Sequence, residues 1–93
     1  MPRIIELQVP ISEYIPIKVG TKSFQFGVND RDYRVGDVLR LREWDELSQK
    51  YTGETCWREV TYITKGASVP IPSNYAILSL RPIKERRGRP KIK

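Results

Sequence analysis

Short stretches in which apolar and polar residues alternate recur along the chain, and this period of two is typical of β-strands. The clearest is residues 38–44, where Leu39 and Leu41 alternate with Arg40 and Arg42. The pattern predicts five strands in all, at residues 4–9, 22–28, 38–44, 56–64 and 75–83. Trp44 and Trp57 lie on two of these strands, so a cross-strand Trp–Trp pair is expected.

One helix is predicted beside the strands, over residues 11–20. Gly20 is suited to close it, whereas Pro16 lies inside it and opposes it. We expect its apolar residues to face the core, namely Ile11, Tyr14, Ile15 and Ile17. The polar stretch after the third strand predicts a hairpin loop with Thr52 and Gly53 at its tight end.

Five short strands with one weak helix predict a mainly β protein, a small barrel or half-open sheet. Pro82 suits the end of the last strand, because proline has no backbone N–H for the ladder. Apolar residues become scarce after Ile83, so we expect a folded domain at residues 1–83 and a disordered basic tail at residues 84–93.

Composition excludes several classes of protein. The 93 residues include no histidine and a single cysteine, Cys56, so neither an internal disulfide nor a Cys/His zinc site is expected, and no metal or other cofactor is predicted. A lone thiol favours the cytoplasm, and Cys56 is expected to be a small buried residue. No apolar run is long enough to span a membrane, and no secretory signal is recognised.

The net charge of +6 is unevenly distributed. Residues 84–93 hold six Lys/Arg and one Glu, a net charge of +5, whereas residues 1–83 hold eleven Lys/Arg and ten Asp/Glu. Attraction to a polyanion such as nucleic acid is therefore expected to come mainly from the tail.

The tail contains Arg87-Gly88-Arg89-Pro90 in a basic setting, and this stretch resembles the AT-hook, a short motif that binds the DNA minor groove. Glycine allows the backbone to lie close to the groove floor, and proline keeps the segment extended. The resemblance implies that Arg87 and Arg89 enter an A·T-rich groove. It further implies phosphate contacts from Arg86, Lys91 and Lys93. Glu85 departs from the motif, and a solvated terminus without a ligand is the plainer interpretation.

The body of the chain carries a second resemblance, in four ordered segments: Gly20-x-Lys22-x-Phe24, Asn29-Asp30-Arg31-Asp32-Tyr33, Val35-Gly36-Asp37 and Leu41-Arg42-Glu43-Trp44-Asp45. They resemble the ASCH/PUA-like superfamily, and within it small bacterial and phage RNA-binding domains related to ASCH. The resemblance covers about residues 5–82 and implies a PUA-like β-barrel with a short helix. Gln25 and Gly27 depart from it, since the family usually has Glu and Arg there.

Two interpretations of residues 29–37 stay open. In the structural one, Asn and Asp side chains close turns, and Arg31 pairs with a neighbouring aspartate. In the functional one, Lys22, Arg31, Tyr33 and Arg34 line one mouth of the barrel and bind an unstacked base and its phosphate. The leading hypothesis is a nucleic-acid-binding module that binds RNA or A·T-rich DNA.

Two alternatives belong to other classes. Some members of the wider superfamily are amidohydrolases that act on modified nucleosides, and Lys22 matches their lysine, with Ser23 near the position of their hydroxyl. Gln25 opposes catalysis, because an amide does not titrate and cannot act as a general base. The other alternative is a phage or accessory protein-interaction module, in which an edge strand adds a strand from a partner.

Overall fold

The computed structural model describes residues 3–67 and 69–83. It has a mainly β fold with one short helix, which confirms the predicted class. In chain order the elements are β1 (Ile4–Pro10), α1 (Ile11–Val19), β2 (Phe24–Val28), β3 (Val38–Asp45), β4 (Lys50–Lys65) and β5 (Tyr75–Pro82). Each predicted strand corresponds to an observed one, and β5 ends at Pro82 as expected.

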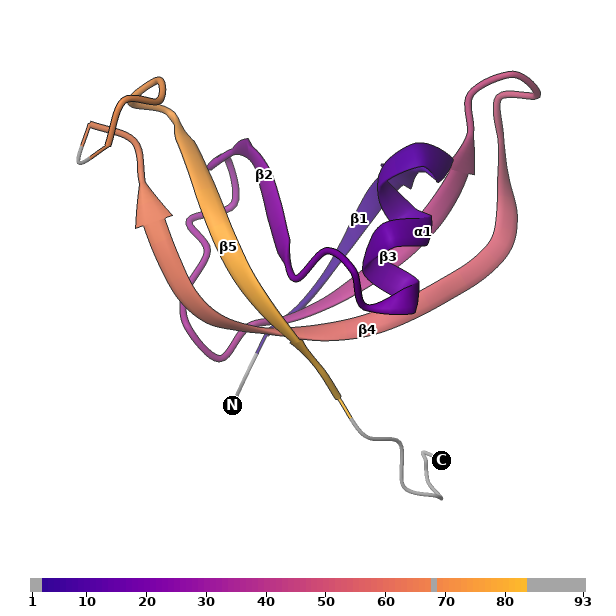
Figure 1. Ribbon diagram of the computed structural model, residues 1–93, viewed down its shortest axis with the longest axis horizontal. Coiled ribbons are helices and arrows are strands. Elements are labelled where there is room, and N and C mark those ends of the chain that lie inside the picture. The colour runs from indigo at the N-terminus through magenta and orange to yellow at the C-terminus, as the bar shows by residue number, and fades with distance from the viewer. Residues whose placement is uncertain (1–2, 68, 84–93) are drawn as a thin grey trace.

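All five strands form one sheet in the order β1-β3-β4-β5-β2. β1 runs parallel to β3, whereas the other neighbouring pairs are antiparallel. Figure 1 shows that the sheet curls around a concave face, with α1 lying over one side of it. β1 and β2 are the two edges of the curl and do not pair with each other. The sheet is thus a half-barrel, and we call the boundary between β1 and β2 the seam.

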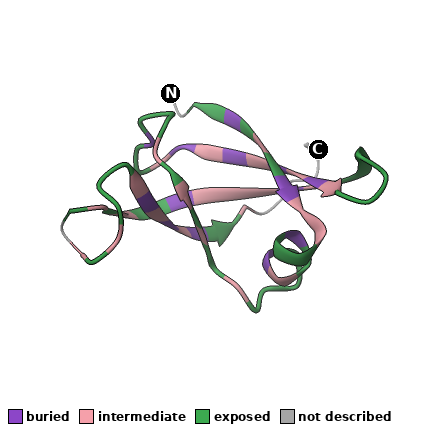
Figure 2. Ribbon diagram, turned by 90° about the horizontal axis from the view of Figure 1, so that it is seen from above, coloured by how far each residue is buried: buried purple, intermediate pink, exposed green. Residues whose placement is uncertain are grey.

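The core lies on the concave face, where alternate residues of four strands meet two residues of α1. Four core residues are completely buried, Val9, Leu39, Leu41 and Val60. Each points inward, from a strand that either has neighbours on both sides or lies under the helix. The remaining core residues are Ile5, Tyr14, Ile17, Tyr33, Cys56, Ala76, Leu78 and Leu80. Figure 2 shows these buried positions as separate bands along the strands, as the two-residue period requires.

α1 forms despite Pro16, which removes one backbone donor from its interior. Tyr14 and Ile17 pack into the core and hold the helix in place, since packing of one face supplies most helical stability in proteins. Gly20 ends the helix in the left-handed conformation with φ of 94°. Arg58 of β4 donates to the carbonyl oxygen of Ile17 at 2.9 Å, and the backbone N–H of Gly20 donates to the same oxygen at 3.2 Å, so this carbonyl group at the helix end has two donors.

Ile15 was expected to contact the core, and this prediction was wrong. Its side chain is 49% exposed, whereas Tyr14 and Ile17 are buried. In a helix of 3.6 residues per turn, residues 14 and 17 share one face, whereas residue 15 is turned about 100° from residue 14, away from that face.

The hairpin between β3 and β4 differs from its prediction. β3 ends at Asp45 and β4 already begins at Lys50, so Thr52 and Gly53 lie inside β4. The Asp45 carboxylate closes the turn by accepting from the backbone N–H of Leu47 at 2.9 Å. Gly53, with φ of 97°, instead lies where the pairing of the two strands shifts register.

The two tryptophans lie in different cross-strand pairs. Trp44 pairs with Tyr51, and their rings meet edge to face with centroids 5.0 Å apart. Trp57 pairs with Arg40, whose guanidinium lies 6.0 Å from its ring centroid. The expected Trp–Trp pair was therefore wrong, because the register of β3 and β4 places Trp57 opposite Arg40 and not opposite Trp44.

None of the helices among residues 3–67 and 69–83 is long and apolar enough to cross a membrane.

Candidate functional site

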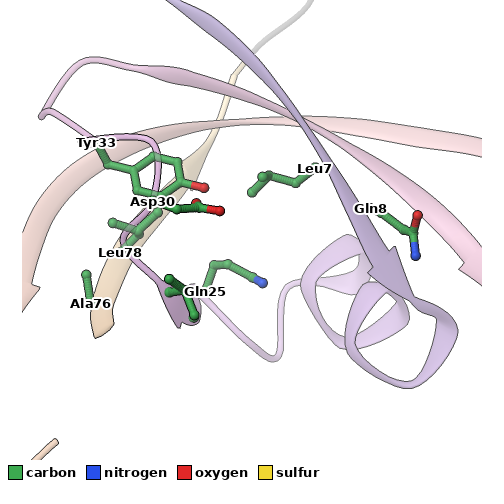
Figure 3. Close-up of a pocket in the computed structure, with 9 residues that line it drawn as sticks. Leu7, Gln8, Gln25, Asp30, Tyr33, Ala76 and Leu78 are labelled. Carbon is green, nitrogen blue, oxygen red and sulfur yellow. The ribbon is translucent and has the colours of Figure 1, made fainter. Parts of the chain in front are cut away.

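A cavity of about 190 Å³ lies at the seam. It is bordered by both edge strands, by β5 and by the loop after β2. Its lining residues are Leu7, Gln8, Gln25, Gly27, Val28, Asp30, Tyr33, Ala76 and Leu78. Figure 3 shows Leu7 reaching in from β1 and Gln25 from β2, with the ring of Tyr33 above Leu78 and Ala76. The cavity thus combines an aromatic and aliphatic wall with a few polar groups, as small-molecule sites commonly do.

The loop at residues 29–37 holds Tyr33 at the cavity through side chains that bind its own backbone. The Asn29 side-chain oxygen accepts from the backbone N–H of Tyr33 at 3.3 Å. The Asp37 carboxylate accepts from the backbone N–H of Arg34 at 2.8 Å. The turn-closing role predicted for the asparagine and aspartate side chains is confirmed.

Arg3, just before β1, ties this loop to the sheet. Its guanidinium donates to both carboxylate oxygens of Asp37, at 2.7 and 3.2 Å, and to the carbonyl oxygen of Asp32 at 2.9 Å. Asp37 is 4% exposed, and the hydrogen bonds from Arg3 lower the pKa of its carboxyl group more than burial raises it. The carboxylate is therefore a charged, fully engaged anchor for the wall of the cavity.

Tyr33 provides the aromatic part of the wall, and its ring is 7% exposed. Burial and the nearby negative charge of Asp30 raise the pKa of its phenol, while the charges of Arg31 and Arg3 oppose this effect. The hydroxyl group accordingly keeps its proton at neutral pH. It can both donate and accept a hydrogen bond at the cavity.

Gln25 borders the cavity and carries a buried acceptor without a partner. Only two buried side-chain polar atoms of the described residues lack a hydrogen-bond partner, Tyr14 Oη and Gln25 Oε1. Tyr14 belongs to α1, lies beside Cys56 and does not border the cavity, whereas Gln25 does. An unpaired buried polar atom costs about 1–3 kcal/mol, so it requires an explanation in the function or in the packing.

Asp30 differs from the two other aspartates of its loop. Asp32 pairs with Arg34 at 3.3 Å, and Asp37 pairs with Arg3. Within the described part of the chain, the carboxylate of Asp30 has neither an ion pair nor a hydrogen bond. Figure 3 shows it beside the Tyr33 hydroxyl. The cavity therefore has a charged acceptor at its border as well as the amide of Gln25.

The four residues predicted to line the barrel mouth do not gather around this cavity, since only Tyr33 borders it. Lys22 pairs with Glu13 of α1 and lies 5.0 Å from the centroid of the Phe24 ring. Arg34 is occupied by Asp32. Arg31 is exposed, and its guanidinium pairs with no group of the described residues, so the expected pair with Asp30 or Asp32 does not form.

The other predicted nucleic-acid contacts are Arg86, Arg87, Gly88, Arg89, Pro90, Lys91 and Lys93. All of them lie outside the described residues, and their role stays a prediction from the sequence.

Gln25, Gly27 and Asp30 were not predicted as site residues, although β2 carried a signal. Its sequence FQFGV alternates, and the apolar residues of such a strand usually face the core. Here the pattern is inverted: Phe24 and Phe26 are each 43% exposed, while Gln25 and Gly27 face the cavity. Polar and small residues on the concave side of an edge strand indicate a site rather than a core.

The hydrolase alternative receives no support from the cavity, because neither Lys22 nor Ser23 borders it. Glu43 accepts from Thr52 at 2.6 Å, and Glu59 pairs with Arg81 at 2.9 Å, so both carboxylates are engaged elsewhere. In the parts of the chain that the structure describes, no group of three metal-ligating side chains is close enough to hold a metal ion. Catalysis stays a prediction from the resemblance alone.

A family model described as a domain of unknown function, DUF3850, matches residues 4–80. The chain belongs to this family. The matched range begins with β1 and ends within β5, so it includes every residue that borders the cavity. No curated protein matches the chain.

Proposed function

We propose that this DUF3850 protein is a nucleic-acid-binding module whose seam cavity holds one unstacked base. The cavity itself carries the proposal. A cavity of about 150 Å³ is large enough to bind benzene, so about 190 Å³ accommodates one planar heterocycle. Tyr33 offers an aromatic wall, and Gln25 and Asp30 offer hydrogen-bonding groups, which are the features that proteins use to bind splayed-out bases.

The charge distribution supports a polyanionic ligand that also contacts the tail. Residues 1–83 have a net charge of +1, and most of their cations are already paired, whereas residues 84–93 add +5. Arg31 is exposed, unpaired among the described residues, and close enough to Tyr33 for its charge to oppose the rise that burial causes in the pKa of the phenol. In this arrangement Arg31 contacts the phosphate next to the bound base, and the tail attracts the strand at longer range.

Filling the cavity tests the proposal directly. A Cβ added at Gly27 meets no atom within 4 Å, so Gly27→Ala fits without a clash, and Gly27→Val adds two further methyl groups at the cavity that Gly27 borders. We expect Gly27→Val to fold and to lose about five- to a hundredfold in affinity for single-stranded RNA, because base stacking contributes about 1–3 kcal/mol. Gly27→Ala, which fills less of the cavity, serves as the graded control.

The measurement is fluorescence anisotropy with labelled single-stranded RNA, a structured RNA, and A·T-rich and G·C-rich duplexes. Each ligand is measured at two salt concentrations with the full chain, with both Gly27 variants and with a 1–83 truncation. Removal of the tail should flatten the salt dependence, since about five phosphate contacts correspond to a log–log slope near −4. Unchanged affinity of a folded Gly27→Val variant for every ligand contradicts a role for the cavity. A preference for the A·T duplex that disappears with the tail assigns the binding to the tail instead.

A further inference from the structure

We infer that the free edge of β2 pairs with β2 of a second copy of this chain, antiparallel and about a two-fold axis at Phe26. β2 is an edge strand, because within the described chain it pairs with β5 alone. Three apolar side chains of this strand, Phe24, Phe26 and Val28, are 43%, 43% and 45% exposed. The inference goes beyond the proposed function, since it depends on the edge of β2 and not on a base in the cavity.

The same three residues direct their backbone groups away from β5. The carbonyl oxygen of Ser23 accepts from the backbone N–H of Leu80 at 2.8 Å, just before β2 begins. Hydrogen-bonded pairs alternate along an antiparallel ladder, so the next bonds to β5 come from Gln25 and Gly27. The N–H and C=O groups of the three exposed residues therefore point to the free edge, where no strand of residues 3–67 and 69–83 pairs with them.

β2 lacks the features that usually keep an edge strand from pairing. The other edge strand, β1, carries Glu6 and ends at Pro10, and charge and proline are common protection at a sheet edge. β2 has the sequence FQFGV, with neither a charged residue nor a proline. An uncharged edge with exposed aromatic side chains is a template for the addition of another strand.

The sequence of β2 is complementary to itself, which favours a second copy as the added strand. Antiparallel pairing centred on Phe26 places the two Phe26 side chains opposite each other and Phe24 opposite Val28. On the other face of the strand Gln25 lies opposite Gly27, which has no side chain to oppose it. The free N–H and C=O groups of both copies then occupy the hydrogen-bonded positions of the new ladder. Each residue pair occurs twice, as a two-fold interface requires.

The charges beside the strand agree with the same pairing. Lys22 lies two residues before β2 and Asp30 two residues after it. The two-fold register brings Lys22 of each copy towards Asp30 of the other, so that opposite charges approach. A dimer would also join two basic tails of net charge +5 in one assembly. A polyanion that contacts both tails would be bound more tightly than by one.

Sedimentation equilibrium of the full chain, freed of nucleic acid, tests the inference. We expect a monomer–dimer equilibrium with a Kd on the order of 100 μM, because the contact is smaller than the roughly 1,200 Å² of a stable interface. Phe26→Lys and Phe26→Glu should each weaken association at least about tenfold, since like charges would face each other across the axis. The two variants mixed in equal amounts should associate again, because a lysine then faces a glutamate.

Tyr62→Lys is the matched control, because it adds the same charge at an exposed aromatic residue of β4, a strand inside the sheet. It should leave the Kd unchanged, and thermal unfolding should show that all three variants fold. A full chain that stays monomeric up to about 1 mM, ten times the expected Kd, overturns the inference and leaves the edge to a strand of another protein. Association that survives both Phe26 variants, or that mixing them does not restore, also overturns it.

Amide hydrogen exchange of the wild type provides a test that needs no variant. Exchange at Phe24, Phe26 and Val28 should slow as the protein concentration rises through the Kd, because their N–H groups become bonded to the second copy. Gln25 and Gly27 already donate to β5 and should show a smaller change. Exchange at the three residues that does not depend on concentration contradicts pairing at this edge.

Discussion

The two sides of the half-barrel differ in how tightly their apolar residues are packed and in how completely their polar groups are paired. On the closed side, where β1, β3 and β4 pair, Leu39 and Leu41 are completely buried, and Arg40 and Arg42 both pair with Glu6. On the seam side, a cavity remains in the concave face, and the exposed face of β2 carries two phenylalanines. The closed side is closely packed and its charges are paired, whereas the seam side keeps a cavity, a buried acceptor without a partner at Gln25 and an exposed carboxylate at Asp30.

The largest expected difference between the sides concerns two buried leucines. Leu41→Ala on the closed side should lower the free energy of unfolding by about 3–5 kcal/mol, because a fully packed site cannot collapse around the new void. Leu78→Ala should cost less, about 2–3 kcal/mol, since Leu78 already borders the cavity and has fewer packing partners on that side.

Urea denaturation of both variants measures this difference in the free energy of unfolding, with the dependence on urea concentration expected to be the same for both. The closed side contains the better packed core only if Leu41→Ala is the more destabilising. Equal losses would mean that Leu78 is as tightly packed as Leu41, and the contrast between the two sides would fail for the apolar groups.

Asp37 joins the two sides, and Asp37→Asn should lower the free energy of unfolding by about 1–3 kcal/mol. The substitution removes the charge that Arg3 binds while it keeps the size of the side chain. The pKa of Asp37 is lower in the folded protein than its ordinary value, so its contribution is complete above that value and is lost as the pH falls through the folded pKa. The difference between wild type and variant should therefore shrink in acid.

Thermal unfolding between pH 3 and pH 7 checks this expectation. If the difference in stability between wild type and Asp37→Asn stays constant across this pH range, the charge of Asp37 does not contribute to stability. A variant as stable as the wild type at pH 7 would show that the loop does not need the anchor at all.

The contrast between the two sides also explains how much of the fold could be predicted from the sequence. Alternation located all five strands, because a sheet with one face turned inward imposes a period of two on each strand. It did not locate the register shift at Gly53, since the pairing of β3 with β4 depends on the turn at Asp45 and on the packing of Trp44 against Tyr51. Local propensity cannot encode such a tertiary choice.

The candidate site was predicted from residue types, and only Tyr33 was placed correctly at the cavity. Lys22 and Arg34 have the charge that a phosphate requires, but carboxylates nearby in space occupy them. Which cations are free is decided by ion pairs that form only in the folded chain. Two site residues were missed, Gln25, which the sequence marked only as a departure from the family pattern, and Asp30. Both become notable because they border the cavity, and because the buried oxygen of Gln25 has no partner in the described structure.

The smallest expected effects come from two substitutions, each of which removes one polar group from one side of the half-barrel. Their effects on stability should have opposite signs, so together they distinguish the two sides most clearly. Gln25→Met replaces the orphan acceptor with an apolar group of similar shape, so it should leave stability unchanged or raise it by up to about 1 kcal/mol. Glu6→Gln removes the partner of two arginines on the exposed face and should lower stability by at most about 1 kcal/mol, less at high salt. Opposite signs in parallel thermal melts would show that natural stability is given up at the seam for binding. Clear destabilisation by Gln25→Met would mean that its amide is satisfied in solution, which removes the reason to regard the seam as an unfilled site.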